Sequence, residues 1–481
     1  MTKRRNFIKK SAMAFGAVTI LPNHVVFGKK PIYNSKGEVV KKGTVLPNDK
    51  VNMGFCGIGN RGGQIFNEFV KTGMVNVAVF CDTDMGAEHT LKNLEAFPDV
   101  PRFQDFRKML DSTAGDLDGV CIGTPDFSHF PIAMLAMSLG KNVYVEKPLS
   151  RTFEESELLM DAAKRHNVIT QMGNQGHSGE NYFQFKSWVE NGIIKDVTKV
   201  TAHMNGRRRW HGWDTSMKQF PEAQNMPDTL DWDTWLGTAK HHGYHEDFIN
   251  GQWRCWYDFG MGALGDWGAH IMDTMHQFLD LGLPSVIDPV KIEGHNLLFY
   301  PQASTIDFKF PKRKKMPPLT ISWYDGMNNI PEIPEGYGKS ELDPNIPAAS
   351  NGKIKPNKLN PGKIIYSKDL TFKGGTHSSP LSIIPEEAAK DMAPKLPVVP
   401  ESPSNHFENF ALACRGEETT RSPFEISAPL SQVFCLGTIA QRLNTKLKFD
   451  RKKKRITNNE LANQLLVGAP PRKEWEEFYK L

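Results

Sequence analysis

Between residues 50 and 175, short apolar runs alternate with amphipathic stretches along the chain. The apolar runs are rich in valine and bounded by Gly, Pro or Asp, which predicts strands that are buried on both faces. These five expected strands lie at residues 51–59, 75–82, 116–125, 141–148 and 168–175. Strands that alternate with helices predict a parallel, doubly wound sheet. We therefore expect an α/β fold whose first unit, residues 50–174, is a Rossmann domain.

Beyond residue 175 this regular alternation is lost. Helices are expected at residues 183–194, 265–281, 404–417 and 427–444, and strands at 196–206, 289–298, 304–311 and 319–326. Residues 205–260, rich in Trp, His, Gly and Pro, are expected to form ordered loops, and the Pro-, Asn- and Lys-rich residues 325–404 an irregular insertion. Residues 175–481 are thus expected to form a second domain, of mixed α and β structure.

The first 28 residues have the layout of an export signal. A basic region, which includes Arg4 and Arg5, precedes a mildly apolar stretch at 11–21 that is too short to span a bilayer. The run RRNFIK at 4–9 is typical of a twin-arginine signal. We expect a signal at 1–28, a polar linker at 29–49 and a periplasmic location. The alternative is the basic, disordered start of a cytoplasmic protein.

The formal net charge of +5 belongs to this signal. Residues 1–28 hold five basic residues and no acidic one, so the remaining chain is close to neutral. Nothing in the charge pattern therefore indicates nucleic acid as a partner. No run of about 18 apolar residues occurs, so no membrane span is expected. These patterns favour a small-molecule partner.

The cysteines and histidines give no clear metal site. The six cysteines form no C-x-x-C pair, and three of them lie inside expected strands, where cysteine packs as a small hydrophobe. The closely spaced His241, His242 and His245 lie in a loop without the helical frame of a typical zinc site. We expect no metal, and the spacing leaves a disulfide open.

The first expected strand runs into a glycine-rich turn that matches the pattern G-x-G-x-x-G. The residues of this turn are Gly57, Ile58, Gly59, Asn60, Arg61 and Gly62. Gly57 permits a tight turn, Gly59 lets backbone N–H groups approach a pyrophosphate, and Gly62 allows close packing of helix and strand. The turn therefore predicts a dinucleotide site, and the alternative is a Rossmann-like domain that binds another nucleotide or none.

An acidic residue completes this dinucleotide pattern. Asp82 ends the next expected strand, 23 residues after Gly59. Its carboxylate would accept hydrogen bonds from ribose hydroxyls and repel a 2′-phosphate, so NAD is favoured over NADP. Arg61 is the counter-argument, because it could pair with that phosphate.

A lysine follows another expected strand, in the run Val145-Glu146-Lys147-Pro148. Ligands of parallel sheets bind outside the carboxyl ends of the strands, so Lys147 is placed to polarise a substrate hydroxyl. The alternative is a surface lysine in a turn.

Asp266 and His270 lie four residues apart in an apolar, glycine-rich segment. Four residues make one helical turn, so both side chains would share a face. In one interpretation His270 is a general base and Asp266 orients it. In the other, Asp266 caps a helix and His270 is a satisfied core histidine.

Taken together, these motifs resemble the Gfo/Idh/MocA oxidoreductases, the family of glucose–fructose oxidoreductase and inositol dehydrogenase. The matching segments are GIGNRG at 57–62, CDTD at 81–84, GTPDFSH at 123–129, EKP at 146–148, and Asp266 with His270. The region 406–481 resembles the family's exported bacterial branch. The resemblance covers nearly all of the chain after the signal. It implies a Rossmann domain followed by an α+β domain with a large, open, mostly antiparallel sheet, and a homo-oligomer.

The resemblance also implies roles for individual residues. His270 would take the hydroxyl proton as hydride leaves for the cofactor, Asp266 would orient the imidazole, and Lys147 would lower the hydroxyl pKa. The expected cofactor-binding residues are Gly57, Ile58, Gly59, Asn60, Arg61, Gly62, Asp82, Thr124, Pro125, His129, Glu146, Lys147, Asn174 and Gln175. The expected substrate-binding residues are Lys147, His177, Asp266 and His270.

The resemblance thus implies an NAD-dependent oxidoreductase that acts on a secondary hydroxyl of a sugar or glycoside. Export would favour a tightly held, recycled cofactor, because no soluble NAD pool is expected in the periplasm. An alternative is glycoside cleavage through a transient keto-sugar and elimination, as in the NAD-dependent glycosidases of this superfamily. That group resembles this chain in signal and fold but not in the EKP lysine. A third possibility is a noncatalytic protein that holds NAD.

Overall fold

The computed structural model describes residues 32–33, 39–40, 49–204, 212–314, 316–327, 329–337 and 360–481. The expected signal at 1–28 lies outside the described residues, as does most of the expected linker at 29–49. Within that linker, strands β1 (Ile32–Tyr33) and β2 (Val39–Val40) pair with each other in an antiparallel ladder.

Six parallel strands form the first sheet. In chain order they are β3 (Val51–Cys56), β4 (Val75–Cys81), β5 (Arg102–Phe103), β6 (Gly119–Ile122), β7 (Asn142–Val145) and β8 (Thr170–Met172). Their order across the sheet is β5-β4-β3-β6-β7-β8, with every neighbouring pair parallel. The predicted doubly wound sheet is confirmed. The sequence missed β5 because its two residues form no apolar run.

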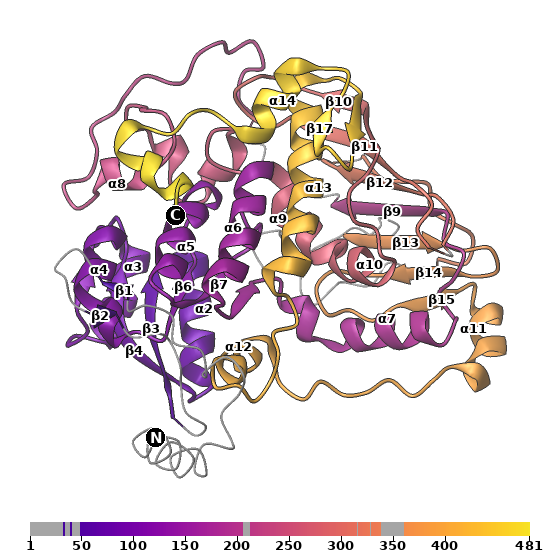
Figure 1. Cartoon of the computed structure of the whole chain (residues 1–481). Helices are drawn as coiled ribbons and strands as arrows, with labels where there is room; N and C mark the ends of the chain where they lie inside the picture. The colour runs from indigo at the N-terminus through magenta and orange to yellow at the C-terminus, as the bar shows by residue number, and fades with distance from the viewer. Residues whose placement is uncertain are drawn as a thin grey trace, which may run out of the picture.

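Helices cover both faces of this sheet (Figure 1). They are α2 (Asn60–Lys71), α3 (Glu88–Ala96), α4 (Phe106–Thr113), α5 (His129–Ser138) and α6 (Phe153–His166). The strand order reverses between β3 and β6, because the chain passes from β3 outward to β4 and β5 and then returns beside β3. Ligands of such sheets bind in the crevice at this reversal, outside the carboxyl ends of the strands.

A nine-stranded sheet forms most of the second half of the molecule. Its strands are β9 (Lys199–Met204), β10 (Val286–Glu293), β11 (Ala303–Phe310), β12 (Leu319–Asp325), β13 (Gly362–Tyr366), β14 (Thr371–Gly374), β15 (Ser382–Ile384), β16 (Leu447–Asp450) and β17 (Arg455–Ile456). Within this sheet β9 and β12 are parallel, and the other neighbouring pairs are antiparallel. The expected large, mostly antiparallel sheet is confirmed.

The stretch 325–404 is more regular than we expected. Its described part contains β13, β14, β15 and the helix α11 (Glu386–Met392). These strands are only three to five residues long, and lysines and prolines separate them, so they form no conspicuous apolar pattern. They nevertheless extend the second sheet, because β13 pairs with β9.

Further helices follow the first sheet along the chain. They are α7 (Glu180–Glu190), α8 (Trp232–Leu236), α9 (Gly262–Ile271), α10 (Asp273–Phe278), α12 (His406–Cys414), α13 (Phe424–Leu443) and α14 (Glu460–Val467). The single helix expected at 265–281 is two helices, α9 and α10, which meet at Met272. Among the described residues, no helix is both long and apolar enough to cross a membrane.

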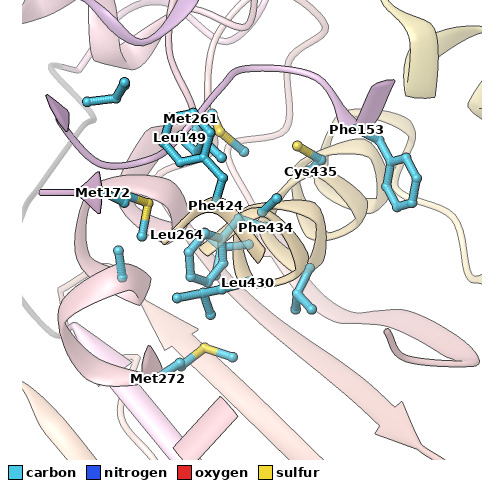
Figure 2. Close-up of a cluster of buried hydrophobic side chains, with 14 of the residues drawn as sticks. Leu149, Phe153, Met172, Met261, Leu264, Met272, Phe424, Leu430, Phe434 and Cys435 are labelled. Carbon is cyan, nitrogen blue, oxygen red and sulfur yellow. The ribbon is translucent and has the colours of Figure 1, made fainter. Parts of the chain in front are cut away.

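The two halves of the molecule share one hydrophobic core around α13. Figure 2 shows Leu149, Phe153 and Met172 from the first half gathered near Leu430 and Phe434 of α13. Because α13 packs against both α6 and α9, it fixes α9 relative to the carboxyl ends of the first sheet. The backbone N–H of Leu149 also donates to the Ser431 hydroxyl of α13, at 3.1 Å.

Close packing of α13 on α9 gives a first prediction, for the variant Gly437→Ala. A Cβ atom at Gly437 would lie 2.4 Å from Leu264 Cδ2 and 2.7 Å from the Phe308 ring. Overpacking of this kind costs about 1–3 kcal/mol, which exceeds the gain of about 1 kcal/mol in helix propensity. The net loss is at most about 2 kcal/mol, so the melting temperature of a chain this long should fall by about 1–2 °C in a thermal unfolding experiment.

The matched control for this prediction is Gly115→Ala. Nothing lies within 4 Å of a Cβ atom at Gly115, so its melting temperature should stay unchanged or rise slightly. Equal melting temperatures for the two variants would contradict the packing argument.

Candidate active site

A cavity of about 450 Å³ lies at the carboxyl ends of the first sheet. Its walls include the glycine turn, the residues after β4, β6 and β7, and part of α9. Residues after β4 and β7 are three strand spacings apart in the sheet, which is about 14 Å. The cavity is therefore long enough for an extended ligand that runs from Asp82 to Lys147.

The glycine turn has the geometry that a dinucleotide requires. Gly57 has a φ of 77°, in the left-handed region that favours glycine. A Cβ atom at Gly62 would lie 2.1 Å from the Gly57 carbonyl oxygen, so α2 can begin against the turn only with glycine there. Gly59 is the N-cap of α2 and makes no side-chain cap, which leaves the positive end of the helix facing the cavity.

Asp82 braces this turn as well as lining the cavity. Its Oδ2 accepts from the backbone N–H of Ile58 at 2.9 Å, and its Oδ1 accepts from that of Asp84 at 3.1 Å. Burial raises the pKa of Asp82, and these two hydrogen bonds oppose that rise. A carboxylate has about four acceptor sites, so Asp82 can still accept hydrogen bonds from a ribose.

The Arg61 side chain interacts with two other side chains of the protein, those of Glu146 and Gln64. Its guanidinium lies 3.6 Å from Glu146 Oε1 and donates to Gln64 Oε1 at 3.2 Å. Glu146 is buried, and it also accepts a hydrogen bond from Gln175 at 3.0 Å. An arginine held in this way is less available for a 2′-phosphate, which agrees with the preference for NAD.

Lys147 and Asp266 meet inside the cavity wall. The Lys147 ammonium donates to Asp266 Oδ1 and to the Asp266 backbone carbonyl, both at 2.8 Å. Burial lowers the pKa of Lys147, and the charge of Asp266 opposes that shift. An ammonium has three donors, so one N–H of Lys147 is left for a ligand.

This pairing corrects the expected role of Asp266. We expected its carboxylate to orient the His270 ring, but within the described part of the chain it binds Lys147 instead. The N-cap interpretation is also wrong, because α9 begins at Gly262 and Asp266 lies inside the helix. The i, i+4 spacing specified a shared helix face but not which side chain each residue would meet.

His270 stacks on His377, a residue that the sequence did not single out. The ring centroids are 3.8 Å apart and the ring planes differ by 19°. His270 Nδ1 is enclosed and has no hydrogen-bond partner among the described residues. Burial lowers the pKa of His270 well below its usual value, and the charges of His377, Lys147 and Arg61 lower it further. His270 is therefore neutral near pH 7.

Seven expected site residues do not line the cavity. They are Ile58, Gly62, His129, Glu146, Asn174, Gln175 and His177. Both ring nitrogens of His129 lie 2.9 Å from carbonyl oxygens, those of Thr124 and Pro148, so this histidine ties two cavity loops together.

The expected substrate contact of His177 needs the same correction. His177 is buried, with Nδ1 2.9 Å from Asp273 Oδ2 and Nε2 2.7 Å from Gln277 Oε1. The protein thus occupies both of its ring nitrogens.

The other expected residues lie where a ligand could reach them. Those that line the cavity are Gly57, Gly59, Asn60, Arg61, Asp82, Thr124, Pro125, Lys147, Asp266 and His270. The convergence of Lys147, Asp266 and His270 on one cavity is what a catalytic site requires.

Three further groups at the site were missed. Arg254 Nε lies 3.6 Å from Asp266 Oδ1, and its guanidinium stacks on Trp253 at 4.0 Å. Asp126 is buried, accepts from the backbone N–H of Met261 at 3.1 Å, and has its pKa raised by burial to about 7. Asp126 belongs to the GTPDFSH motif, which could have indicated it. Arg254 and His377 have no motif of their own.

Two segments from the second half cover the Asp82 end of the cavity. Gln104 Nε2 donates to the carbonyl oxygens of Thr83 and Thr229, at 2.9 and 2.8 Å, which ties one segment to the end of β4. In the other segment, Trp475 lines the cavity and packs under the Arg107 guanidinium at 4.4 Å. These two covering segments are residues 229–237 and 472–479.

The described residues contain no group of three or more His, Cys, Asp or Glu side chains placed to hold a metal ion. All six cysteines are free and buried.

Comparison with known families matches two adjacent stretches of the chain. Residues 51–174 match a model described as "Oxidoreductase family, NAD-binding Rossmann fold". Residues 179–296 match its companion, "Oxidoreductase family, C-terminal alpha/beta domain". Together the two stretches make up half of the chain.

Curated relatives of similar sequence come from Shewanella. The chain is 30% identical over 220 residues to "Glycosyl hydrolase family 109 protein 1" of Shewanella sp. (strain ANA-3), which is 43% of this chain and 47% of the relative. It is also 30% identical over 218 residues, with the same shares, to the alpha-N-acetylgalactosaminidase of Shewanella oneidensis. The chain thus spans about half the length of the curated relatives it matches.

Among solved structures, the fold is similar to the WlbA dehydrogenase from Bordetella pertussis, which was crystallised with NADH and UDP-GlcNAcA. The TM-score is 0.54 at 13% identity, over 83% of this chain and 99% of that one. At this identity the likeness shows the fold alone.

Proposed function

This chain belongs to the Gfo/Idh/MocA oxidoreductase family, and we propose that its cavity holds NAD and oxidises a secondary hydroxyl of a sugar or glycoside. The observation that carries the proposal is the meeting of Lys147, Asp266 and His270 in one cavity, at the end opposite Asp82. That arrangement also argues against a noncatalytic holder of NAD, which needs no such cluster.

The residues of the cavity fit NAD. The glycine turn and the start of α2 would hold the pyrophosphate, and Asp82 the adenosine ribose. Thr124, Pro125 and Lys147, which follow β6 and β7, would lie beside the nicotinamide. When bound, NAD supplies the two-electron acceptor for the hydrogen that leaves the carbinol carbon.

Residues of the chain would accept the proton of the substrate hydroxyl and stabilise the negative charge that develops on its oxygen. Lys147 would donate its remaining N–H to the substrate oxygen and stabilise the negative charge that develops there. His270 would accept the hydroxyl proton at Nε2, because its Nδ1 is enclosed and its lowered pKa keeps the ring neutral. Asp266 would act through Lys147, by holding the ammonium in place with two hydrogen bonds.

We further propose that the cofactor is retained between turnovers and is reoxidised in place, either by return of the hydride to the sugar intermediate or by reduction of a second sugar. The two covering segments, residues 229–237 and 472–479, lie over the end of the cavity where the adenosine would bind. Arg472 adds a link between them, since it hydrogen-bonds to the backbone carbonyls of Asp233 and Gly237, at 2.7 and 3.0 Å. A ligand under both segments would leave only when one of them opens.

The Shewanella relatives favour a second candidate, the cleavage of an N-acetylhexosaminide. If the C3 hydroxyl is oxidised to a ketone, the C2–H becomes acidic and the leaving group at C1 can depart by elimination. Water would then add at C1 and the hydride would return to C3, so the cleavage needs no external oxidant. The relatives' printed names, glycosyl hydrolase family 109 and alpha-N-acetylgalactosaminidase, fit this outcome. Both candidates share the first oxidation and use Lys147 and His270 in the same way.

One experiment separates these functions. The purified protein is incubated with NAD in D₂O with free hexoses and with aryl α-N-acetylgalactosaminides. Dehydrogenation predicts reduced cofactor in proportion to the keto-sugar formed. Cleavage predicts release of the aryl group without net cofactor reduction, and deuterium on the carbon next to the oxidised one. Tight NAD binding with neither reaction on any sugar would contradict the proposal.

Replacement of Asp82 by alanine tests the nucleotide assignment. The variant loses the acceptor for the ribose and the negative charge that repels a 2′-phosphate. We expect NAD affinity to fall by about 10-fold or more, from the loss of a charged hydrogen bond, and discrimination against NADP to weaken. Isothermal titration calorimetry of both nucleotides measures this, and unchanged affinity for both would remove the assignment.

A periplasmic location is part of the proposal and rests on the twin-arginine run at residues 4–9. Replacing Arg4 and Arg5 by lysine should retain the protein in the cytoplasm, because the pathway depends on this pair. Cell fractionation and immunoblotting measure the distribution. If the variant still reaches the periplasm, the twin-arginine interpretation is wrong.

A further inference from the structure

The segment between β14 and β15 carries His377 into the cavity wall. Its backbone is fixed from two sides. The His377 N–H donates to the His270 carbonyl at 2.9 Å, and a Cβ atom on Gly176 would lie 2.7 Å from the His377 carbonyl oxygen. His377 has a φ of 51°, a left-handed conformation that costs a non-glycine residue about 1 kcal/mol or more. The fold therefore holds this residue in an unfavourable conformation that places its ring on His270.

The stacking of the two rings disfavours the state in which both carry a proton. They are stacked at a centroid distance of 3.8 Å and nearly parallel, so neither ring can donate an in-plane hydrogen bond to the other. Both line the cavity, and His270 is buried. Two positive charges at this separation, one of them on the buried His270 ring, oppose each other strongly.

Other charged groups also face His270. Lys147 after β7 and Arg61 of α2 add positive charge, and Asp266 on α9 itself opposes them. After burial, His377 has the largest influence on the pKa of His270, ahead of both Lys147 and Arg61.

We propose that His377 is a positioning residue of this reaction, which forms with His270 a stacked imidazole pair that admits only one proton. Because the rings are stacked, a proton on His377 would add to the effect of burial and further disfavour a proton on His270, which extends the pH range over which His270 can act as a base. The pair replaces the expected Asp266–His270 dyad, because Asp266 is held by Lys147. The inference rests on the proposed function only for its effect on turnover, since the pair itself needs neither substrate nor cofactor.

The test is an NMR titration of the histidine rings in the full chain, labelled with ¹³C at histidine. The His270 signal is assigned by its absence from His270→Gln. In the wild type, the two rings should take up protons in two separate steps, with His270 protonated only well below pH 6.5, as expected of coupled sites. Titration of both rings at the same pH would overturn the proposal without bearing on the proposed function.

Two variants of His377 measure the coupling directly. In His377→Asn the second charge is lost while the left-handed backbone is kept, because asparagine tolerates that conformation. In His377→Phe the stacked ring is kept without its charge. Both variants should raise the pKa of His270 by about one unit, which is a tenfold gain in proton affinity. A shift of this size is typical when a neighbouring positive charge is lost. A purely packing role predicts that His377→Phe leaves the titration of His270 unchanged, and that result would overturn the proposal.

Gly176→Ala and His276→Asn complete the set. Gly176→Ala must displace the His377 backbone, so it should shift the titration of His270 in the same direction without touching either ring. His276 is buried on α10, its Nε2 lies 2.9 Å from the Gly282 carbonyl, and it does not line the cavity. His276→Asn should therefore leave His270 unchanged. If one His377 variant fails to fold, the titration of His270 in the other His377 variant and in Gly176→Ala tests the proposal.

Discussion

Lys147→Met is expected to lower turnover about 10²–10³-fold, the usual loss when one donor to a developing oxyanion is removed. Methionine keeps much of the length of the side chain but can neither donate to the substrate oxygen nor offset its charge. NAD affinity should fall far less than turnover, because Lys147 would lie beside the nicotinamide but not at the glycine turn or Asp82, which would hold the rest of the cofactor. Steady-state kinetics on the substrate found by the D₂O experiment, with calorimetry of NAD binding, measure both effects.

Lys141→Met is the matched control for this variant. Lys141 is fully buried at the other end of β7, where its ammonium donates to the Leu117 carbonyl at 2.8 Å. Its replacement should lower stability and leave turnover per folded molecule unchanged. Equal losses of turnover in the two variants would show that a buried lysine matters here only for folding.

His270→Gln is expected to lower turnover about 10²–10⁴-fold, the range for a lost general base. The pH dependence of turnover identifies the base more specifically than the rate at a single pH. The base works unprotonated and its pKa lies well below 6.5, so wild-type turnover should fall only as the pH drops through that low pKa. In His270→Gln this acid limb should disappear.

The matched control is His276→Gln, a buried histidine on the next helix whose pKa is lowered to about 4 by burial. This variant should keep both the rate and the acid limb of the profile. An unchanged acid limb in His270→Gln would assign that titration to another group, and the base would have to be sought elsewhere.

The sequence predicted the parts of this molecule that follow from local patterns. The first sheet could be predicted because its strands are buried on both faces, so their apolar runs are continuous. The glycine turn could be predicted because Gly57 and Gly62 meet steric demands that only glycine satisfies. Both features depend on residues close together in the chain.

The rest of the site depends on contacts between distant residues. Asp266 meets Lys147 across 119 positions, and His377, which meets His270, lies in the stretch expected to be an irregular insertion. His129 and His177 show the opposite error, because histidines near a site can be tied up entirely in structural hydrogen bonds. The homo-oligomer and the domain boundaries stay predictions, since they rest on the resemblance and on composition.

The most direct test of the central claim is a crystal structure of the chain with NAD bound. The account predicts adenosine beside Asp82 under the two covering segments, pyrophosphate on the glycine turn, and the nicotinamide ring in the part of the cavity formed by Thr124, Lys147 and His270. A nucleotide bound in the reverse direction, or outside this cavity, would contradict the account.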